Sequence, residues 1–267
     1  MPKIGLIAGN RKFPIILASE AKKKGYSTVA IAIKGETSPA LSGYVERIYW
    51  LGLDEFSKIF EVCRKENISE VVMAGQISPH QLFRPKLRKS KELNSLLDSL
   101  RDKRADTIFG AIAQRLEESG IKMLNSTFLL DEFLPRKGTL TQHEPDFSHW
   151  EDIYLGLRIA KEIANLDIGQ TVAIRDKAII AVEAFEGTDN LIRRAGKITR
   201  RGTIVIKVSK PRQDMRFDVP VVGLNTIKNL IRARAAGLAI EAGKTLFIEQ
   251  GQALKLADKK GVFIVAL

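Results

Sequence analysis

Short apolar runs alternate with segments of helical periodicity through the first half of the chain, and this alternation constrains the fold more than any other feature. The run from Lys3 to Ala8 precedes apolar residues at helical spacing that end at Gly25. A second apolar run, Ser27 to Ile33, is separated from a third, Val71 to Ala74, by an expected helix from Asp54 to Glu66. Strands and helices that alternate in this way predict a parallel, doubly wound α/β sheet.

A change in composition marks a domain boundary near the middle of the chain. Between Leu134 and Ser148 the residues Pro135, Gly138 and Pro145 interrupt every periodicity. A chain of 267 residues is long enough for about two domains. We therefore expect one domain over residues 1–134 and a second over residues 135–267.

The second half again combines helices and strands. We expect a helix from Trp150 to Asn165, a strand pair between Gln170 and Val182, and a helix from a cap at Asn225 to Ala242. Further strands are expected at 203–208, 219–222, 245–249 and 262–266. In the first half, a polar helical region is expected from about Ser90 to Ser119. The second domain is thus predicted to be α/β as well.

The chain is strongly basic, with 43 Lys and Arg against 31 Asp and Glu and a net charge of +12. Such an excess attracts nucleic acid, an anionic membrane or a phosphorylated substrate. The densest basic run, Arg84 to Arg104, has no interleaved aromatic residues and no nucleic-acid motif, so no nucleic-acid partner is expected. A solvated helical face, phosphate steering and contact with an anionic membrane surface remain open for this run.

The compartment is inferred from the cysteine content and from the absence of membrane signals. The single cysteine, Cys63, lies in an apolar helical run and is interpreted as a core residue. The longest stretch without charged residues, Val71 to Phe83, is too short to span a bilayer, and no secretory signal is recognisable at the amino terminus. We expect a cytoplasmic protein.

Two glycine turns follow the first and third expected strands. Gly9 and Asn10 open a helix at the carboxyl end of a strand, where backbone N–H groups favour a phosphate. Gly75 and Gln76 form a second turn of the same kind, and an ordinary tight turn explains either pair equally well. The G-x-G-x-x-G and P-loop spacings are absent, which disfavours a dinucleotide enzyme or a nucleoside triphosphatase.

Two polar loops, residues 183–190 and 210–220, carry closely spaced acidic and basic side chains next to apolar strands. Surface ion pairs are the simpler explanation for any single residue. Asp218 and Glu183, however, border apolar residues where an unpaired carboxylate is costly to bury. If the loops converge, their carboxylates suit Mg²⁺ or Mn²⁺; these are Glu183, Glu186, Asp189, Asp214 and Asp218. The three histidines are too few and too scattered for a zinc site, and no G-x-S-x-G nucleophile motif is present.

Several motifs in order along the chain carry a family resemblance. They are I-G-L-I-A-G (4–9) with F-P (13–14), V-M-A-G (72–75), L-D-I-G-Q (166–170), E-A-F-E-G-T-D (183–189), Q-D-M-R-F-D-V-P (213–220) and A-G-L (236–238). Together they resemble the LpxI family of UDP-2,3-diacylglucosamine pyrophosphatases. The fourth and fifth motifs are specific in combination.

The resemblance implies a hydrolase of lipid A biosynthesis that cleaves the diphosphate of UDP-2,3-diacylglucosamine to UMP and 2,3-diacylglucosamine 1-phosphate (lipid X). It implies Mg²⁺, with Mn²⁺ as the alternative, and attack of water on the sugar-side phosphorus. It also implies a Rossmann-like amino-terminal domain, an α/β carboxyl-terminal domain, substrate between them and a homodimer. For the basic run we expect contact with anionic lipid headgroups, which would place the protein peripherally at the inner membrane.

The resemblance also assigns roles to individual residues. Asp218 is the first choice for the essential acid and Asp214 the second; with Glu183 they are the expected metal ligands, and Lys210 is a further catalytic candidate. The candidates for substrate binding are Gly9, Asn10, Gly75, Gln76, Glu186, Gly187, Thr188, Asp189, Arg194, Gln213 and Arg216. Two alternatives stand beside this interpretation: a Rossmann-type nucleotide-sugar or dinucleotide enzyme, and a nucleotide-sugar- or lipid-binding protein of the same fold without hydrolase activity.

Overall fold

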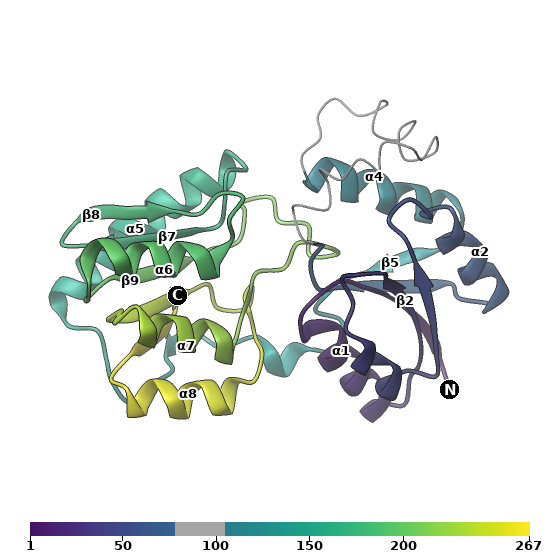
Figure 1. The fold of residues 1–267 in the computed structure, drawn as a ribbon, viewed down its shortest axis with the longest axis horizontal. Helices are drawn as coiled ribbons and strands as arrows, with labels where there is room; N and C mark the ends of the chain where they lie inside the picture. The colour runs from purple at the N-terminus through teal and green to yellow at the C-terminus, as the bar shows by residue number, and fades with distance from the viewer. Residues whose placement is uncertain (78–104) are drawn as a thin grey trace. The chain divides into compact units, whose positions relative to one another are not determined.

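A computed structural model describes residues 1–77 and 105–267, and the basic run from Arg84 to Arg104 lies outside the described residues (Figure 1). The chain forms two compact units. The first comprises residues 1–130 together with Asp214–Asp218, and the second comprises residues 131–213 and 219–267. The five residues Asp214–Asp218, although late in the sequence, therefore belong to the amino-terminal unit.

The first unit is built on a five-stranded sheet whose order is β3-β2-β1-β4-β5, with every strand pair parallel. This finding confirms the predicted parallel sheet. The strands are β1 (Lys3–Ala8), β2 (Ser27–Ile33), β3 (Arg47–Leu51), β4 (Glu70–Ala74) and β5 (Lys122–Leu124).

Helices flank this sheet on both faces (Figure 1). Its helices are α1 (Phe13–Lys23), the 3₁₀ turn η1 (Pro39–Tyr44), α2 (Lys58–Lys65) and α4 (Ala105–Glu118). Residues of α2 and α4 share one apolar core with Ile7 of β1 and with Val29 and Ile31 of β2. The prediction that a helix starts at Asp54 is wrong, because Glu55 folds back to accept a hydrogen bond from the Gly52 N–H at 2.7 Å and α2 begins only after Ser57.

The second unit contains a six-stranded mixed sheet of order β6-β13-β11-β9-β7-β8. The three central strands β9, β11 and β13 are parallel, whereas β7 runs antiparallel to β8 and β9. A separate parallel pair is formed by β10 and β12. The strands are β6 (Gly138–Thr139), β7 (Thr171–Arg175), β8 (Ala178–Val182), β9 (Ile204–Lys207), β10 (Val221–Val222), β11 (Gly237–Ile240), β12 (Leu246–Phe247) and β13 (Phe263–Ala266).

Four helices complete the second unit: α5 (Phe147–Asn165), α6 (Thr188–Thr199), α7 (Leu224–Arg232) and α8 (Gln250–Lys259). Helix α5 packs against one apolar core of the sheet, and α6, α7 and α8 pack against another, with α7 and α8 side by side in Figure 1. Of these helices, α6 and α8 were not predicted from the sequence.

The predicted helix from Asn225 to Ala242 is wrong in its second half. Helix α7 ends at Arg232, Arg234 adopts a left-handed φ of 52°, and the chain enters the sheet as β11. The ring of Phe263 packs so closely against Gly237 that an added Cβ would lie 2.1 Å from a ring carbon. Pairing with β9 and β13 therefore decides the conformation of a segment whose residues, taken alone, favour a helix.

Cys63 is buried and free, as expected for a core residue, and burial raises the pKa of its thiol to about 11. Such a thiol is inert at neutral pH. In the part of the chain that the structure describes, no helix has the length and apolar character needed to cross a membrane.

Candidate functional site

In the first unit, the two glycine turns lie side by side at the carboxyl ends of β1 and β4. The Gly9 N–H donates to the Ala74 carbonyl at 2.8 Å, and the Asn10 N–H donates to the Gln76 carbonyl at 2.7 Å. The strand order reverses direction between β1 and β4, and such switch points are where α/β sheets bind ligands. The structure therefore brings the predicted residues Gly9, Asn10, Gly75 and Gln76 together.

Both turns need glycine. A Cβ on Gly9 would lie 2.5 Å from the Gln76 carbonyl oxygen, and Gly75 has a φ of +87° with the Asn10 carbonyl 2.6 Å from its notional Cβ. Because the N–H groups of Gly9 and Asn10 are used to join the two turns, these amides do not form the phosphate cradle that the sequence suggested. The turns instead make a closely packed rim, on which the Asn10 side chain donates to Glu36 at 2.7 Å.

The segment Asp214–Asp218 is fixed to the first unit by Ser126. The Ser126 N–H donates to the Met215 carbonyl at 2.7 Å, and its buried hydroxyl lies 2.8 Å from the carbonyl oxygen of Arg216 and 2.7 Å from that of Met73. Phe217 packs against the core beneath α2 and α4. The acidic motif is thus held by its backbone, next to the end of β4.

Asp214 forms a bidentate ion pair with Arg216. The Asp214 carboxylate accepts from the Arg216 backbone N–H at 3.0 Å, from Nε at 3.0 Å and from Nη2 at 2.7 Å, and Arg216 Nη1 donates to Glu117 at 2.7 Å. Burial alone would raise the pKa of Asp214, but the hydrogen bonds from Arg216 outweigh it and lower that pKa. The same pair, through the hydrogen bond from Asp214 above all, raises the pKa of Arg216. Both oxygens of Asp214 are therefore engaged.

Asp218 ends the same turn. Its backbone N–H donates to the Asp214 carbonyl at 3.2 Å, and the residue is partly exposed. Asp214 and Asp218 are thus in the first unit, whereas the third predicted metal ligand, Glu183, is in the second. Their common role as metal ligands stays a prediction.

In the second unit, three polar side chains form a buried relay at the ends of β8 and β9. Lys207 ends β9 and donates through Nζ to the Thr188 hydroxyl oxygen at 2.9 Å, and that hydroxyl donates to Glu183 Oε1 at 2.8 Å. Lys207 is 7% exposed and Glu183 is 8% exposed. We call these three residues the Lys207 relay.

The sequence interpretation missed Lys207, although a signal for it was present. The strand Ile204–Lys207 is apolar up to its last residue, and a lysine that ends a buried strand has to be paired or functional. The other oxygen of Glu183, Oε2, is buried without a hydrogen-bond partner among the residues that the structure describes. The relay therefore joins a buried ammonium to a carboxylate that has one oxygen left for a donor or a cation.

The other candidates around the start of α6 have partners within their own unit. Arg194 donates to Glu186 at 2.5 Å and to the Val182 carbonyl at 2.8 Å. Burial would raise the pKa of Glu186, but hydrogen bonds from its own backbone and from Arg194 lower it. Asp189 accepts from Asn229 at 2.9 Å and from Asn225 at 3.0 Å, which ties α6 to α7.

Gly187, which precedes α6, has a left-handed φ of 79°. Lys210 and Gln213 shape the chain that leaves β9: Lys210 Nζ lies 2.6 Å from Asp167, and the Lys210 N–H donates to the Gln213 side chain at 2.8 Å. These contacts orient the loop from within the second unit.

The carboxylates of the described residues meet the needs of a metal site only in part. Across residues 1–77 and 105–267, no group of three or more His, Cys, Asp or Glu side chains is placed to hold a metal ion. The chemistry of Glu183 nevertheless fits a cation ligand, because Oε2 is a hard oxygen without a donor. Asp214 fits less well, since Arg216 already neutralises it.

Comparison with solved structures gives weak likenesses. A pyruvate carboxylase from Rhizobium etli is 12% identical, with 65% of this chain and 15% of that chain covered and a TM-score of 0.31. An N5-carboxyaminoimidazole ribonucleotide synthetase from Thermotoga maritima is 14% identical, with 71% and 43% covered and a TM-score of 0.25. Likenesses of this size support no conclusion about fold or function.

Comparison by sequence is decisive. A protein of Caulobacter vibrioides named UDP-2,3-diacylglucosamine pyrophosphatase LpxI is 32% identical over 277 aligned residues, which cover 100% of this chain and 98% of the relative. The model of the LpxI N-terminal domain matches residues 3–133, and that of the LpxI C-terminal domain matches residues 136–265. The chain therefore belongs to the LpxI family.

Proposed function

We propose that the protein is a UDP-2,3-diacylglucosamine pyrophosphatase, which hydrolyses the diphosphate of its substrate to UMP and lipid X in lipid A synthesis. The observation that carries this proposal is the match of both LpxI domains, in order, together with a full-length relative that bears the name of this activity. The Lys207 relay adds a buried ammonium, which is chemistry that suits a nucleotide-linked phosphate.

Lys207 is the residue that we propose to bind a phosphate oxygen. Its ammonium is buried and has the Thr188 hydroxyl as its hydrogen-bond partner. Thr188 begins α6, a helix of 12 residues, so the positive end of the helix dipole adds to the charge of Lys207. In a buried setting of low dielectric, such a cation stabilises the negative charge that builds up during phosphoryl transfer.

Glu183 and Asp218 are the carboxylates that we propose to act on the cation or the attacking water. When bound, Mg²⁺ would supply a Lewis acid that polarises a phosphoryl oxygen. Glu183 Oε2 has no hydrogen-bond partner among the described residues, so its lone pairs are left for such a ligand or for a water hydrogen. Asp214 instead holds Arg216 together with Glu117, so we propose that this ion pair orients the turn that ends at Asp218.

For the nucleotide, we propose the switch point between β1 and β4, as in Rossmann-like units. The support is the position of the rim formed by Gly9, Asn10, Gly75 and Gln76. The absence of Cβ atoms at both glycines lets the two turns pack against each other, and the exposed Gln76 at the end of the second turn is the part of the rim that a ligand can reach.

The experiment is hydrolysis of UDP-2,3-diacylglucosamine by purified protein, followed as UMP release with Mg²⁺, with Mn²⁺ and with EDTA. We expect UMP with a divalent cation and none with EDTA. Asp218→Ala should abolish turnover, whereas Lys177→Met, a substitution at an exposed lysine paired with Glu151, should not change it. Binding of the substrate without UMP under any metal would favour the binding protein of the same fold instead.

A further inference from the structure

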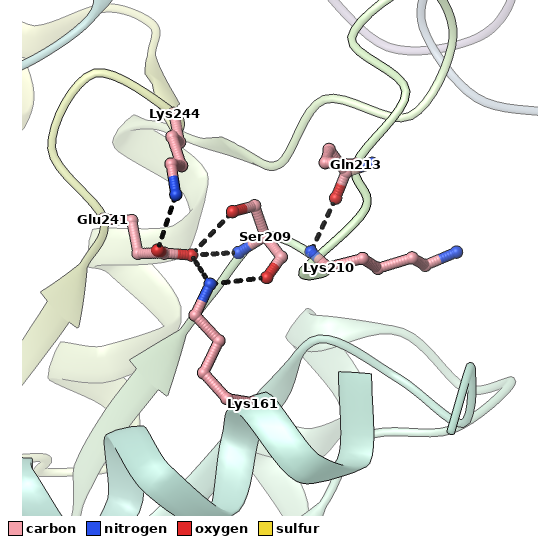
Figure 2. A network of polar contacts seen from close by, with 6 residues as sticks. All are labelled: Lys161, Ser209, Lys210, Gln213, Glu241 and Lys244. Atoms are coloured by element: carbon pink, nitrogen blue, oxygen red, sulfur yellow. Dashed lines mark hydrogen bonds and ion pairs between the residues drawn. The ribbon is translucent and has the colours of Figure 1, made fainter. Parts of the chain in front are cut away.

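Glu241 is a buried carboxylate that follows β11 directly and is 9% exposed. Figure 2 shows it at the centre of a polar network that joins three separate parts of the second unit. Lys161 comes from α5, Ser209 follows β9, and Lys244 follows β11. None of these four residues belongs to the candidates described above.

The network fixes Ser209 by every polar group it has. Glu241 Oε2 accepts from the Ser209 N–H at 2.5 Å, from the Ser209 hydroxyl at 2.7 Å and from Lys161 Nζ at 2.6 Å. Lys161 Nζ also donates to the Ser209 carbonyl at 2.9 Å. Ser209 is fully buried, and its N–H, hydroxyl and carbonyl groups are all paired within the network.

Glu241 is ionised in this setting. Its burial alone would raise its pKa, but hydrogen bonds from Lys161 and Ser209 lower it below the ordinary value. A buried carboxylate that accepts from a backbone N–H, a hydroxyl and an ammonium is well compensated, which explains why it is tolerated at the end of a strand.

Ser209 lies between two functional parts of the chain. Lys207 precedes it by two residues on β9, and the segment that carries the acidic motif begins at Lys210. In Figure 2 the Lys210 side chain points away from Glu241, and the Gln213 side chain accepts from the Lys210 N–H. The path from β9 into residues 210–213 therefore starts from one residue that Glu241 holds.

We propose that Glu241 is a positioning residue for the reaction: through Ser209 it sets the direction in which residues 210–213 leave β9, and it keeps Lys207 in register. This role rests on the proposed function, because it assumes that Lys207 takes part in hydrolysis. Glu241 itself does not touch the substrate in this proposal. Residues that orient active groups in this way typically cost about 10-fold to 100-fold in activity when replaced.

Asp152 provides a matched control. It is also a buried carboxylate of the second unit, 6% exposed, and it accepts from the backbone N–H groups of Asp176 at 2.9 Å and Lys177 at 2.6 Å. Like Glu241 it is a buried carboxylate that accepts from backbone N–H groups, but it anchors the turn between β7 and β8 rather than the chain that leaves β9.

The test compares Glu241→Gln with Asp152→Asn in steady-state hydrolysis and in thermal unfolding. We expect both to lower Tm, but only Glu241→Gln to lower kcat, by about 10-fold to 100-fold with KM nearly unchanged. Equal kcat values in the two variants would overturn the proposal. If Glu241→Gln does not fold, Lys161→Met decides, because it removes the donor shared by Glu241 and the Ser209 carbonyl; a normal kcat there would count against a positioning role.

A readout that does not depend on activity separates this proposal from the proposed function. Hydrogen–deuterium exchange should rise in peptides over 209–213 in Glu241→Gln, and only near residues 175–178 in Asp152→Asn. If wild-type protein releases no UMP while this exchange pattern is found, the proposed function fails and the anchoring by Glu241 stands. Unchanged exchange over 209–213 would show that Glu241 does not hold these residues.

Discussion

The candidate sites of the two units consist of different chemical groups. In the first unit, the rim at β1 and β4 is made of backbone, because two glycines allow main chains to approach closely. In the second unit, the ends of β8 and β9 are made of buried charges, in the Lys207 relay and the Glu241 network. Close backbone packing therefore determines the candidate site of the first unit, and buried charges determine that of the second. We expect substitutions in the first unit to lower mainly stability and substitutions in the second to lower mainly activity.

Within the second unit, the largest expected effect is the loss of activity in Lys207→Met. Removal of one preorganised donor to a developing negative charge typically costs about 100-fold to 1,000-fold in kcat. Met keeps the volume of the side chain, so the β9 strand should remain packed. The measurement is kcat/KM for UMP release, with Lys177→Met as the control; a value within a few-fold of wild type would remove Lys207 from the site.

In the first unit the corresponding test is Gly75→Ala, and here stability should change. The left-handed φ of Gly75 and a notional Cβ 2.6 Å from the Asn10 carbonyl oxygen predict a loss of about 1 to 3 kcal/mol in the free energy of unfolding. Urea unfolding would measure it. Gly43→Ala is the control, since no heavy atom lies within 4 Å of the Cβ position there and its φ is not positive. Equal stability of the two variants would contradict the inference that close packing of the two glycine turns determines the structure of the rim.

The sequence predicted the strands and turns correctly where the local pattern of residues was strong. The buried strands β1 and β4 have unbroken apolar runs, and β7 and β8 flank an obvious turn, so each was predicted close to its observed place. Helix α6 was missed because Gly187, Asp189 and Asn190 read as loop formers, although its buried face is regular.

The candidate site was harder to predict, because its contacts join residues far apart in sequence. The motif Asp214–Asp218 was found from its composition, but its attachment to the first unit depends on the contact of Ser126 with Arg216, 90 residues away. The spacing of apolar residues along the sequence gives no information about a contact between residues so far apart. Lys207 is different: the polar end of an apolar strand was visible in the sequence and could have been read as a signal.

The electrostatic character of the second unit also predicts how its stability depends on pH. The folded-state pKa of Glu241 lies below its ordinary value of 4.5, so its stabilising contribution is present above pH 4.5 and is lost as pH falls through the lower, folded value. The difference in unfolding free energy between wild type and Glu241→Gln should therefore be largest near neutral pH and shrink below pH 4.5. A difference that grows on acidification would mean that Glu241 is not held as the charged form.

The smallest expected effect tests whether Asp189 serves structure or substrate. Its carboxylate accepts from Asn229, which is buried, and from Asn225, which is exposed. Because exposed hydrogen bonds exchange readily with water, Asn225→Ala should cost about 0.5 kcal/mol and Asn229→Ala about 1.5 kcal/mol in unfolding free energy. Neither should change KM if Asp189 only joins α6 to α7. A rise in KM for Asn229→Ala, with Asn225→Ala unaffected, would instead mean that the orientation of Asp189 matters to substrate, and that the start of α6 works through placed charges like the rest of this unit.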